Sequence, residues 1–141
     1  MKSTAIWTKG FQSVVDNGRN HSVIIDLPEA KGGENAGPTA LELSVMSFCG
    51  CVSTIFTMLA PKMRISFDHL KVEVFAEQES GAKTITDIHC VLYVTTSSSL
   101  EEIEKCLEHT VNNCPVGLIF RQAGVEISLE VIHELPSCSG A

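Results

Sequence analysis

The chain has 141 residues, a length that fits one domain and allows a buried hydrophobic core. Hydrophobic residues make up 44% of it and charged residues 19%, a balance that excludes intrinsic disorder. The formal net charge is −7 at pH 7. A surface of that sign repels phosphate backbones, so we expect no nucleic-acid partner. We interpret residues 1–141 as a single domain.

Short β-prone segments occupy the first third of the chain. They lie at Thr4–Lys9, Phe11–Asp16 and His21–Leu27. Asn17 and Gly18 stand between the second and third segments and predict a hairpin, because both residue types tolerate positive φ. The stretch Pro28–Pro38 is rich in glycine and proline and predicts a loop.

A long apolar segment, Thr39–Leu59, follows the loop. It has one charge, Glu42, and apolar side chains on nearly every helical face. A helix of this kind is buried in a core or spans a membrane. Serine, threonine and cysteine dilute its hydrophobicity, and the strands that follow need an apolar partner. We therefore predict a long buried central helix that ends at Pro61, and no membrane partner.

Two alternating strands and two helices complete the chain. The strands Arg64–Glu77 and Thr84–Thr95 carry apolar residues at every second position, which predicts a sheet with one covered face. The pattern of Ser97–Asn113 predicts an amphipathic helix that opens with a capping box. A third helix is predicted at Val116–Gln122 and a last strand at Val125–Glu134. The predicted class is α+β, in the order β-β-β-α-β-β-α-α-β.

The cysteines are six in number: Cys49, Cys51, Cys90, Cys106, Cys114 and Cys138. The first residues do not show the pattern of a secretory signal peptide, so we expect a cytoplasmic protein with reduced thiols. Cys49 and Cys51 point about 200° from each other on a helix, so they cannot bind one metal ion together. The five histidines are scattered singly. We expect neither a metal site nor a bound cofactor.

Three residues are candidates for chemistry. Cys51 follows Gly50, which costs about 1 kcal/mol relative to alanine in a helix and suggests close approach of another backbone or a ligand; a structural buried cysteine is the alternative. Cys114 ends a helix before Pro115. A helix C-terminus raises a thiol pKa, so Cys114 suits a resolving thiol better than a first nucleophile, or else a buried capping residue. Glu42 is either a functional carboxylate or a partner of the helix dipole.

The segment from Gly37 to Cys51 resembles the start of the central helix of the OsmC/Ohr superfamily, which is written G-P-x-P-x-E-(L/M)-L-x-x-A-x-x-G-C. The glycines, the first proline, the glutamate and the cysteine of that pattern match Gly37, Pro38, Glu42, Gly50 and Cys51 without gaps. The segment Asn113-Cys114-Pro115-Val116 resembles the second cysteine motif of the same superfamily. The order of the predicted elements agrees over nearly the whole chain.

This resemblance implies an OsmC-like fold in which two chains form an intertwined homodimer around their central helices. It also implies a thiol-dependent peroxidase. Cys51 would attack an organic hydroperoxide and become a sulfenic acid, and Cys114 would then form a disulfide with it. An external dithiol, small or protein-bound and of the lipoyl type, would reduce that disulfide.

The resemblance also points to groups that would assist the thiolate. Active members of the superfamily pair it with an arginine from the N-terminal strands and with a glutamate. On a gapless count the place of the arginine falls at Lys9, and the nearest arginine is Arg19. The place of the glutamate in the best-studied branch falls at Leu41, which lies about 100° around the helix from Glu42. We take Lys9, Arg19 and Glu42 as candidates to assist Cys51.

Two other classes of function stay open. The missing arginine favours a redox-sensing or apolar small-molecule-binding module on the same fold, with little or no turnover. A purely structural or membrane-associated protein, in which the cysteines only pack, is the third possibility.

Overall fold

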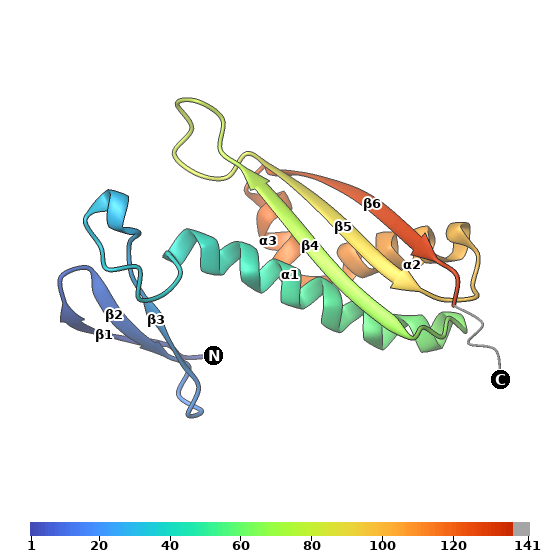
Figure 1. Cartoon of the computed structure of the whole chain (residues 1–141), viewed down its shortest axis with the longest axis horizontal. Helices are drawn as coiled ribbons and strands as arrows, with labels where there is room; N and C mark the ends of the chain where they lie inside the picture. The colour runs from blue at the N-terminus through green and yellow to red at the C-terminus, as the bar shows by residue number, and fades with distance from the viewer. Residues whose placement is uncertain (137–141) are drawn as a thin grey trace. The chain divides into compact units, whose positions relative to one another are not determined.

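The computed structural model describes residues 1–136. Its elements follow the predicted order, and the α+β class is confirmed (Figure 1). They are β1 (Thr4–Lys9), β2 (Gln12–Asp16), β3 (Ser22–Ile25), α1 (Ala40–Leu59), β4 (His69–Glu77), β5 (Asp87–Thr95), α2 (Leu100–Asn113), α3 (Pro115–Gln122) and β6 (Glu126–Glu134), with short 3₁₀ helices at Glu29–Lys31 and Ala60–Met63. The chain divides into two compact units, Met1–Ser44 and Val45–Ala141.

The first unit is an antiparallel sheet in the order β1-β2-β3, followed by a loop. Asp26 is the one buried residue among residues 1–44. Its carboxylate accepts hydrogen bonds from the backbone N–H groups of Leu27 at 2.8 Å, Glu34 at 3.0 Å and Ala36 at 3.1 Å. The Gln12 side chain donates a fourth at 3.3 Å. These bonds hold the loop against the sheet, and the one from Ala36 is the main cause that lowers the pKa of Asp26.

We expect Asp26→Asn to lower the free energy of unfolding at neutral pH, because an amide oxygen and NH₂ group cannot replace a carboxylate that accepts four bonds. The pKa of Asp26 is depressed below its ordinary value of 3.8, so the stabilisation is complete above that value and is lost as the pH falls below it. Urea denaturation should therefore show a smaller difference between wild type and variant at acid pH than at neutral pH. The exposed Asp68→Asn is the control, and an Asp26→Asn effect equal at both pH values would contradict this role.

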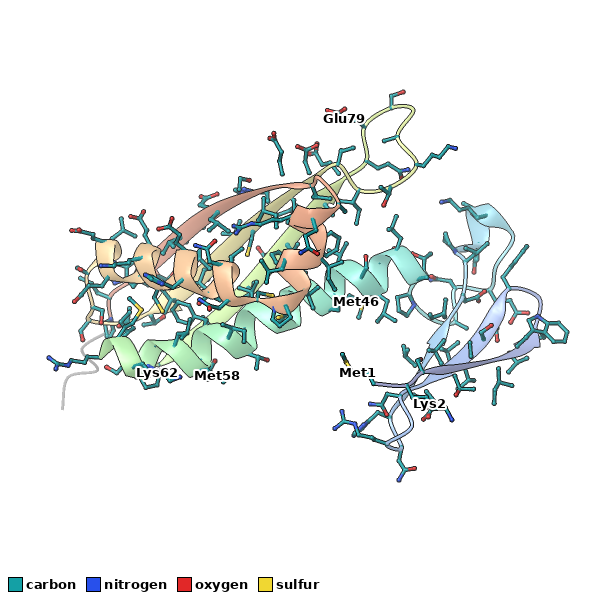
Figure 2. The ribbon with its side chains drawn as sticks, turned by 180° about the vertical axis from the view of Figure 1, so that it is seen from behind. Met1, Lys2, Met46, Met58, Lys62 and Glu79 are labelled. Atoms are coloured by element: carbon teal, nitrogen blue, oxygen red, sulfur yellow. The ribbon has the colours of Figure 1, made fainter. Side chains whose placement is uncertain are left out.

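The second unit contains the sheet β4-β5-β6, with α1, α2 and α3 on one of its faces (Figures 1 and 2). β5 pairs antiparallel with β4 and parallel with β6. The segment with α2 and α3 supplies the crossover that a parallel pair requires. β4 begins at His69 rather than at the predicted Arg64, because the preceding turn is 3₁₀ and Arg64 itself has a φ of 63°, a left-handed conformation that cannot continue into a strand.

The core of the second unit lies between this sheet and the helices. It includes Ile88, Cys90, Leu92 and Val94 of β5, Phe48, Val52 and Phe56 of α1, and Ile103, Cys106, Leu107 and Val111 of α2. The predicted capping box opens α2: the Ser99 hydroxyl accepts the N–H of Glu102, and the Glu102 carboxylate accepts the N–H of Ser99. The alternation predicted for β5 is confirmed at Ile88, Cys90, Leu92 and Val94, which belong to the core, while Val91 is buried outside this core cluster.

One face of α1 is buried in this chain, at Phe48, Val52 and Phe56, which corrects the prediction of a helix buried all round. Met46 and Met58, each 55% exposed, lie on the opposite face (Figure 2). A Cβ built on Gly50 would meet nothing within 4 Å, so the close approach predicted there does not occur within one chain. By length and composition Ala40–Met63 could cross a membrane, but its buried stripe is that of a helix packed on a sheet.

Candidate functional site

The structure brings the thiols of Cys51 and Cys114 together, the first from α1 and the second from the junction of α2 and α3. Cys114 is fully buried, and Cys51 is half-buried against the same hydrophobic core. The Cys51 thiol is near enough to that of Cys114 to raise its pKa. Both are free thiols here. Neighbouring thiols are the groups that can exchange between dithiol and disulfide, so this pair is the candidate redox site.

Cys114 ends α2 and at the same time caps α3. Its backbone is extended, with φ −78° and ψ 113°, and its Sγ accepts the N–H of Gly117 at 3.3 Å. Burial is the main cause that raises the pKa of Cys114 to about 11; the neighbouring Cys51 thiol raises it further, and the Gly117 N–H opposes the rise. The pKa of Cys114 is raised, as predicted from the sequence. The main cause, however, is burial and not the position of Cys114 at the C-terminus of α2.

The remaining described cysteines are less suited to attack a substrate. The Cys49 thiol donates to a backbone carbonyl of β4 at 3.3 Å, and partial burial raises its pKa. Burial raises the pKa of Cys90 to about 12 and also raises that of Cys106. Because the thiolate is the nucleophile, all three are poor first attackers. Cys138 lies outside the described residues.

Lys9 has a partner of its own in the first unit. Its Nζ lies 2.7 Å from Oε2 of Glu34, and both side chains are 62% exposed. Gln12 donates to the same carboxylate oxygen at 2.9 Å. The hydrogen bond from Lys9 is the main cause that lowers the pKa of Glu34. An exposed pair of this kind adds little stability, but it places a carboxylate against the charge of Lys9.

Arg19 and Glu42 also lie in the first unit. Arg19 belongs to the loop between β2 and β3, and its guanidinium makes no hydrogen bond or ion pair with any residue from 1 to 136. The Glu42 carboxylate accepts the N–H of Thr39 at 2.7 Å, and the Thr39 hydroxyl accepts the N–H of Glu42 at 3.2 Å. This reciprocal pair is a capping box that starts α1. The Thr39 N–H is the main cause that lowers the pKa of Glu42, so this carboxylate acts as a cap of the helix.

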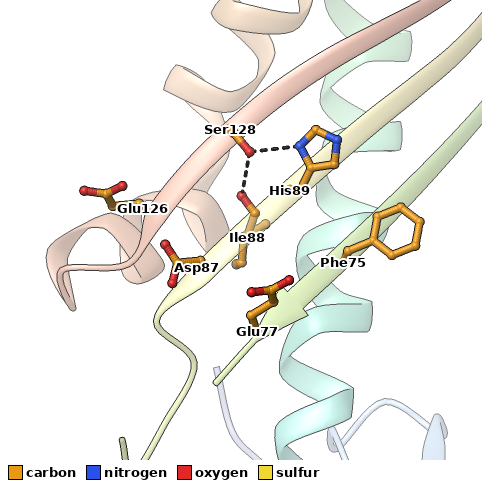
Figure 3. Close-up of a pocket in the computed structure, with 7 residues that line it drawn as sticks. All are labelled: Phe75, Glu77, Asp87, Ile88, His89, Glu126 and Ser128. Carbon is orange, nitrogen blue, oxygen red and sulfur yellow. Dashed lines mark hydrogen bonds between the residues drawn. The ribbon is translucent and has the colours of Figure 1, made fainter. Parts of the chain in front are cut away.

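A second cluster of titratable groups lies on the opposite face of the β4-β5-β6 sheet (Figure 3). Nδ1 of His89 is 2.9 Å from the Ser128 hydroxyl, and Nε2 is 2.9 Å from Glu130. Phe75 stacks on the imidazole with ring centroids 6.3 Å apart. A cavity of about 310 Å³ lies beside His89, Ser128 and Phe75, and is also lined by Ile88 and the carboxylates of Glu77, Asp87 and Glu126. Within residues 1–136, no group of three histidine, cysteine, aspartate or glutamate side chains is placed to hold a metal ion.

Sequence reasoning missed these histidine contacts, because they depend on the pairing of β5 with β6. It also missed the role of Cys114 as the cap of α3. A proline at the first helical position predicts that the preceding residue is the N-cap, so Pro115 carried that signal. The glycine two residues later supplies the N–H that the cap accepts.

Comparisons with known proteins agree with this architecture. A sequence model described as OsmC-like protein matches residues 32–130, and no curated protein matches. An OsmC-like protein from Mycoplasma pneumoniae has a solved structure with 15% identity and a TM-score of 0.84, covering 94% of this chain and 96% of that one. An organic hydroperoxide resistance protein from Elizabethkingia anophelis has 18% identity and a TM-score of 0.75, with 94% of each chain covered.

A third similar structure is an organic hydroperoxide resistance protein OsmC from Legionella pneumophila. It has 16% identity and a TM-score of 0.69, and the match covers 93% of this chain and 96% of that one. At these identities the likeness shows the fold. The family model extends over most of the chain and includes α1, Cys51 and Cys114. The chain therefore belongs to the OsmC-like protein family.

Proposed function

We propose that this protein is a thiol-dependent peroxidase that reduces organic hydroperoxides through Cys51 and Cys114. The observation that carries the proposal is the proximity of these two thiols, of which one is half-buried and one fully buried. The names of the Elizabethkingia and Legionella proteins support the same class of reaction. Cys51, the more accessible of the two, is the group that meets the substrate.

The reaction follows from the order in which the two sulfurs act. The Cys51 thiolate attacks the O–O bond of the hydroperoxide, which gives a sulfenic acid on Cys51 and an alkoxide that is protonated to the alcohol. The Cys114 sulfur then attacks the Cys51 sulfur; the S–S bond forms, the S–O bond breaks and the hydroxide leaves as water. An external dithiol of the lipoyl type restores both thiols by two exchange steps. No bound cofactor takes part.

The surroundings of the pair favour an apolar substrate. Cys51 packs against the same cluster of buried apolar side chains that encloses Cys114. A hydrophobic wall stabilises an alkyl or aryl hydroperoxide by burial of its apolar surface, and it offers hydrogen peroxide no such gain. We therefore assign organic hydroperoxides as the substrate class. Lys9 and Arg19 are the proposed sources of positive charge for the thiolate, and Glu42 the proposed carboxylate.

We also propose an intertwined homodimer, cytoplasmic and with neither membrane nor nucleic-acid partners, in which the two units act as one domain. The exposed apolar side of α1, at Met46 and Met58, is the surface that a second copy would cover. The first unit supports this assembly, since Ile6, Trp7, Phe11 and Ile24 are exposed on it and a single chain leaves it almost without a core.

A redox sensor is the second candidate, and the pair of Lys9 with Glu34 favours it. A lysine paired with a carboxylate stabilises a thiolate less than an unpaired lysine does, because the carboxylate offsets its positive charge. It also lacks the planar fork with which an arginine holds a thiolate and a carboxylate together. A sensor would form the Cys51–Cys114 disulfide once per oxidation, without sustained turnover.

The test is the consumption of cumene hydroperoxide and of hydrogen peroxide by the reduced protein, with dihydrolipoamide as electron donor. We expect sustained turnover, faster with the organic substrate. Stoichiometric disulfide formation without turnover would select the sensor instead. Intact thiols after exposure to either peroxide would refute both.

A further inference from the structure

A surface cavity at the C-terminal end of α1, where Figure 2 labels Lys62, carries an inference that goes beyond the proposed function. Its volume is about 460 Å³, and it is lined by Pro61, Arg64, Ile65, Ser66 and Phe67. We propose that this cavity binds a carboxylate with an apolar chain, of the fatty-acid class. Arg64 holds the head group, and the apolar part of the lining holds the chain.

The walls of the cavity are fixed by the fold. Ile65 is buried in the hydrophobic core of the second unit. Phe67 packs against Phe56 of α1, with ring centroids 5.8 Å apart. The hydroxyl of the buried Thr96 donates a hydrogen bond to the backbone carbonyl of Ser66. These contacts anchor the segment to α1 and to the end of β5, so the cavity is formed before a ligand enters, as small-molecule sites usually are.

Arg64 is the charged group of the lining. Its backbone has a φ of 63°, a left-handed conformation that costs free energy for arginine and that glycine adopts without steric cost. Its guanidinium makes no hydrogen bond or ion pair with any residue from 1 to 136. The fold therefore holds an unpaired cation at a position where glycine would be under less strain. Backbone strain of this kind is concentrated at sites that bind ligands.

The lining selects the chemistry of the ligand. Its five residues include one cation and no carboxylate, although the chain has a net charge of −7. A guanidinium offers parallel N–H donors that match a planar carboxylate, and the exposed Ser66 hydroxyl is a further donor. Pro61, Ile65 and Phe67 supply apolar surface that an alkyl chain would remove from water. The volume lies within the range of about 300–1,000 Å³ that is usual for small-molecule sites.

The test is calorimetric titration of the reduced full-length protein with octanoate and with octan-1-ol, which has the same chain without the charge. We expect octanoate to bind more tightly, by about tenfold or more, because only its head group forms charge-assisted hydrogen bonds. Amide NMR shifts caused by octanoate should map to residues 61–67. Absence of octanoate binding, equal affinity for the alcohol, or shifts confined to other residues would overturn the proposal. No peroxide is added, so the result is independent of the proposed peroxidase activity.

A pair of variants tests Arg64 itself. Arg64→Gly removes the guanidinium and relieves the left-handed strain, so its urea midpoint should stay at or above that of wild type. Its affinity for octanoate should nevertheless fall by about tenfold or more. The matched control is Lys62→Gln, which removes an exposed cation two residues away that does not line the cavity; its affinity should stay within about twofold of wild type. An Arg64→Gly variant that binds octanoate as wild type does, or an equal loss in Lys62→Gln, would overturn the role of Arg64.

Discussion

Replacing Cys51 by serine is expected to abolish hydroperoxide turnover, with a loss of about 10³-fold or more, because a hydroxyl is far less nucleophilic than a thiolate. Cys114→Ser should behave differently. It keeps the attacking sulfur but cannot close the disulfide, so it should consume about one hydroperoxide per chain and then stop while a sulfenic acid accumulates on Cys51. Stopped-flow consumption assays and mass spectrometry of the trapped sulfenic acid measure both effects.

The matched control is Cys49→Ser. It lies two residues from Cys51 on the same helix, is likewise half-buried, and its hydrogen bond to the β4 carbonyl can be kept by a hydroxyl. We expect its turnover to stay near that of wild type. If Cys49→Ser loses activity while Cys51→Ser retains it, the assignment of the two thiols is reversed. If every single variant stays active, the reaction does not use a cysteine pair.

The double variant Met46→Glu with Met58→Glu is expected to yield a monomer. Both side chains are exposed on the side of α1 that faces away from the sheet. In a dimer built on the central helices they would be covered by the second copy, together with their symmetry mates. Burying unpaired carboxylates costs several kcal/mol, which corresponds to a rise in the dimer dissociation constant of about 10³-fold or more. Sedimentation velocity over a range of concentrations gives the result.

Phe75→Glu is the control for this prediction. Phe75 is 54% exposed, almost the same as the two methionines, but it lies on the opposite face of the sheet beside His89. A charge there should leave the dimer intact. A wild-type chain that sediments as a monomer would contradict the proposed assembly, and a double variant that stays dimeric would place the interface elsewhere.

The order of the elements was predictable from sequence because it is recorded in local patterns. Alternation located the strands, and the Ser99 capping box located the start of α2. The predicted start of β4 was wrong because Arg64 adopts a left-handed backbone conformation, which a strand cannot contain. Arginine is not a residue type from which a positive φ is predicted. The prediction that Cys51 and Cys114 act together came from two motifs, while their proximity in the structure depends on tertiary packing.

Other features depend on partners that are distant in sequence. Lys9 and Glu34 meet because hydrogen bonds to Asp26 hold the loop after β3. Sequence patterns do not reveal those hydrogen bonds. The burial of α1 was predicted on all faces because composition describes every face alike. It does not distinguish a face covered by the same chain from one left for a second copy.

The parallel pairing of β5 with β6 has a consequence for the order of events during synthesis. Cys114 lies inside the crossover between these strands, so its position depends on a contact between segments about 40 residues apart, and such non-local contacts form late. A nascent chain that ends before Glu126 carries both Cys51 and Cys114 but lacks the strand that fixes the crossover. We expect such a chain to leave these two thiols apart until β6 has emerged from the ribosome.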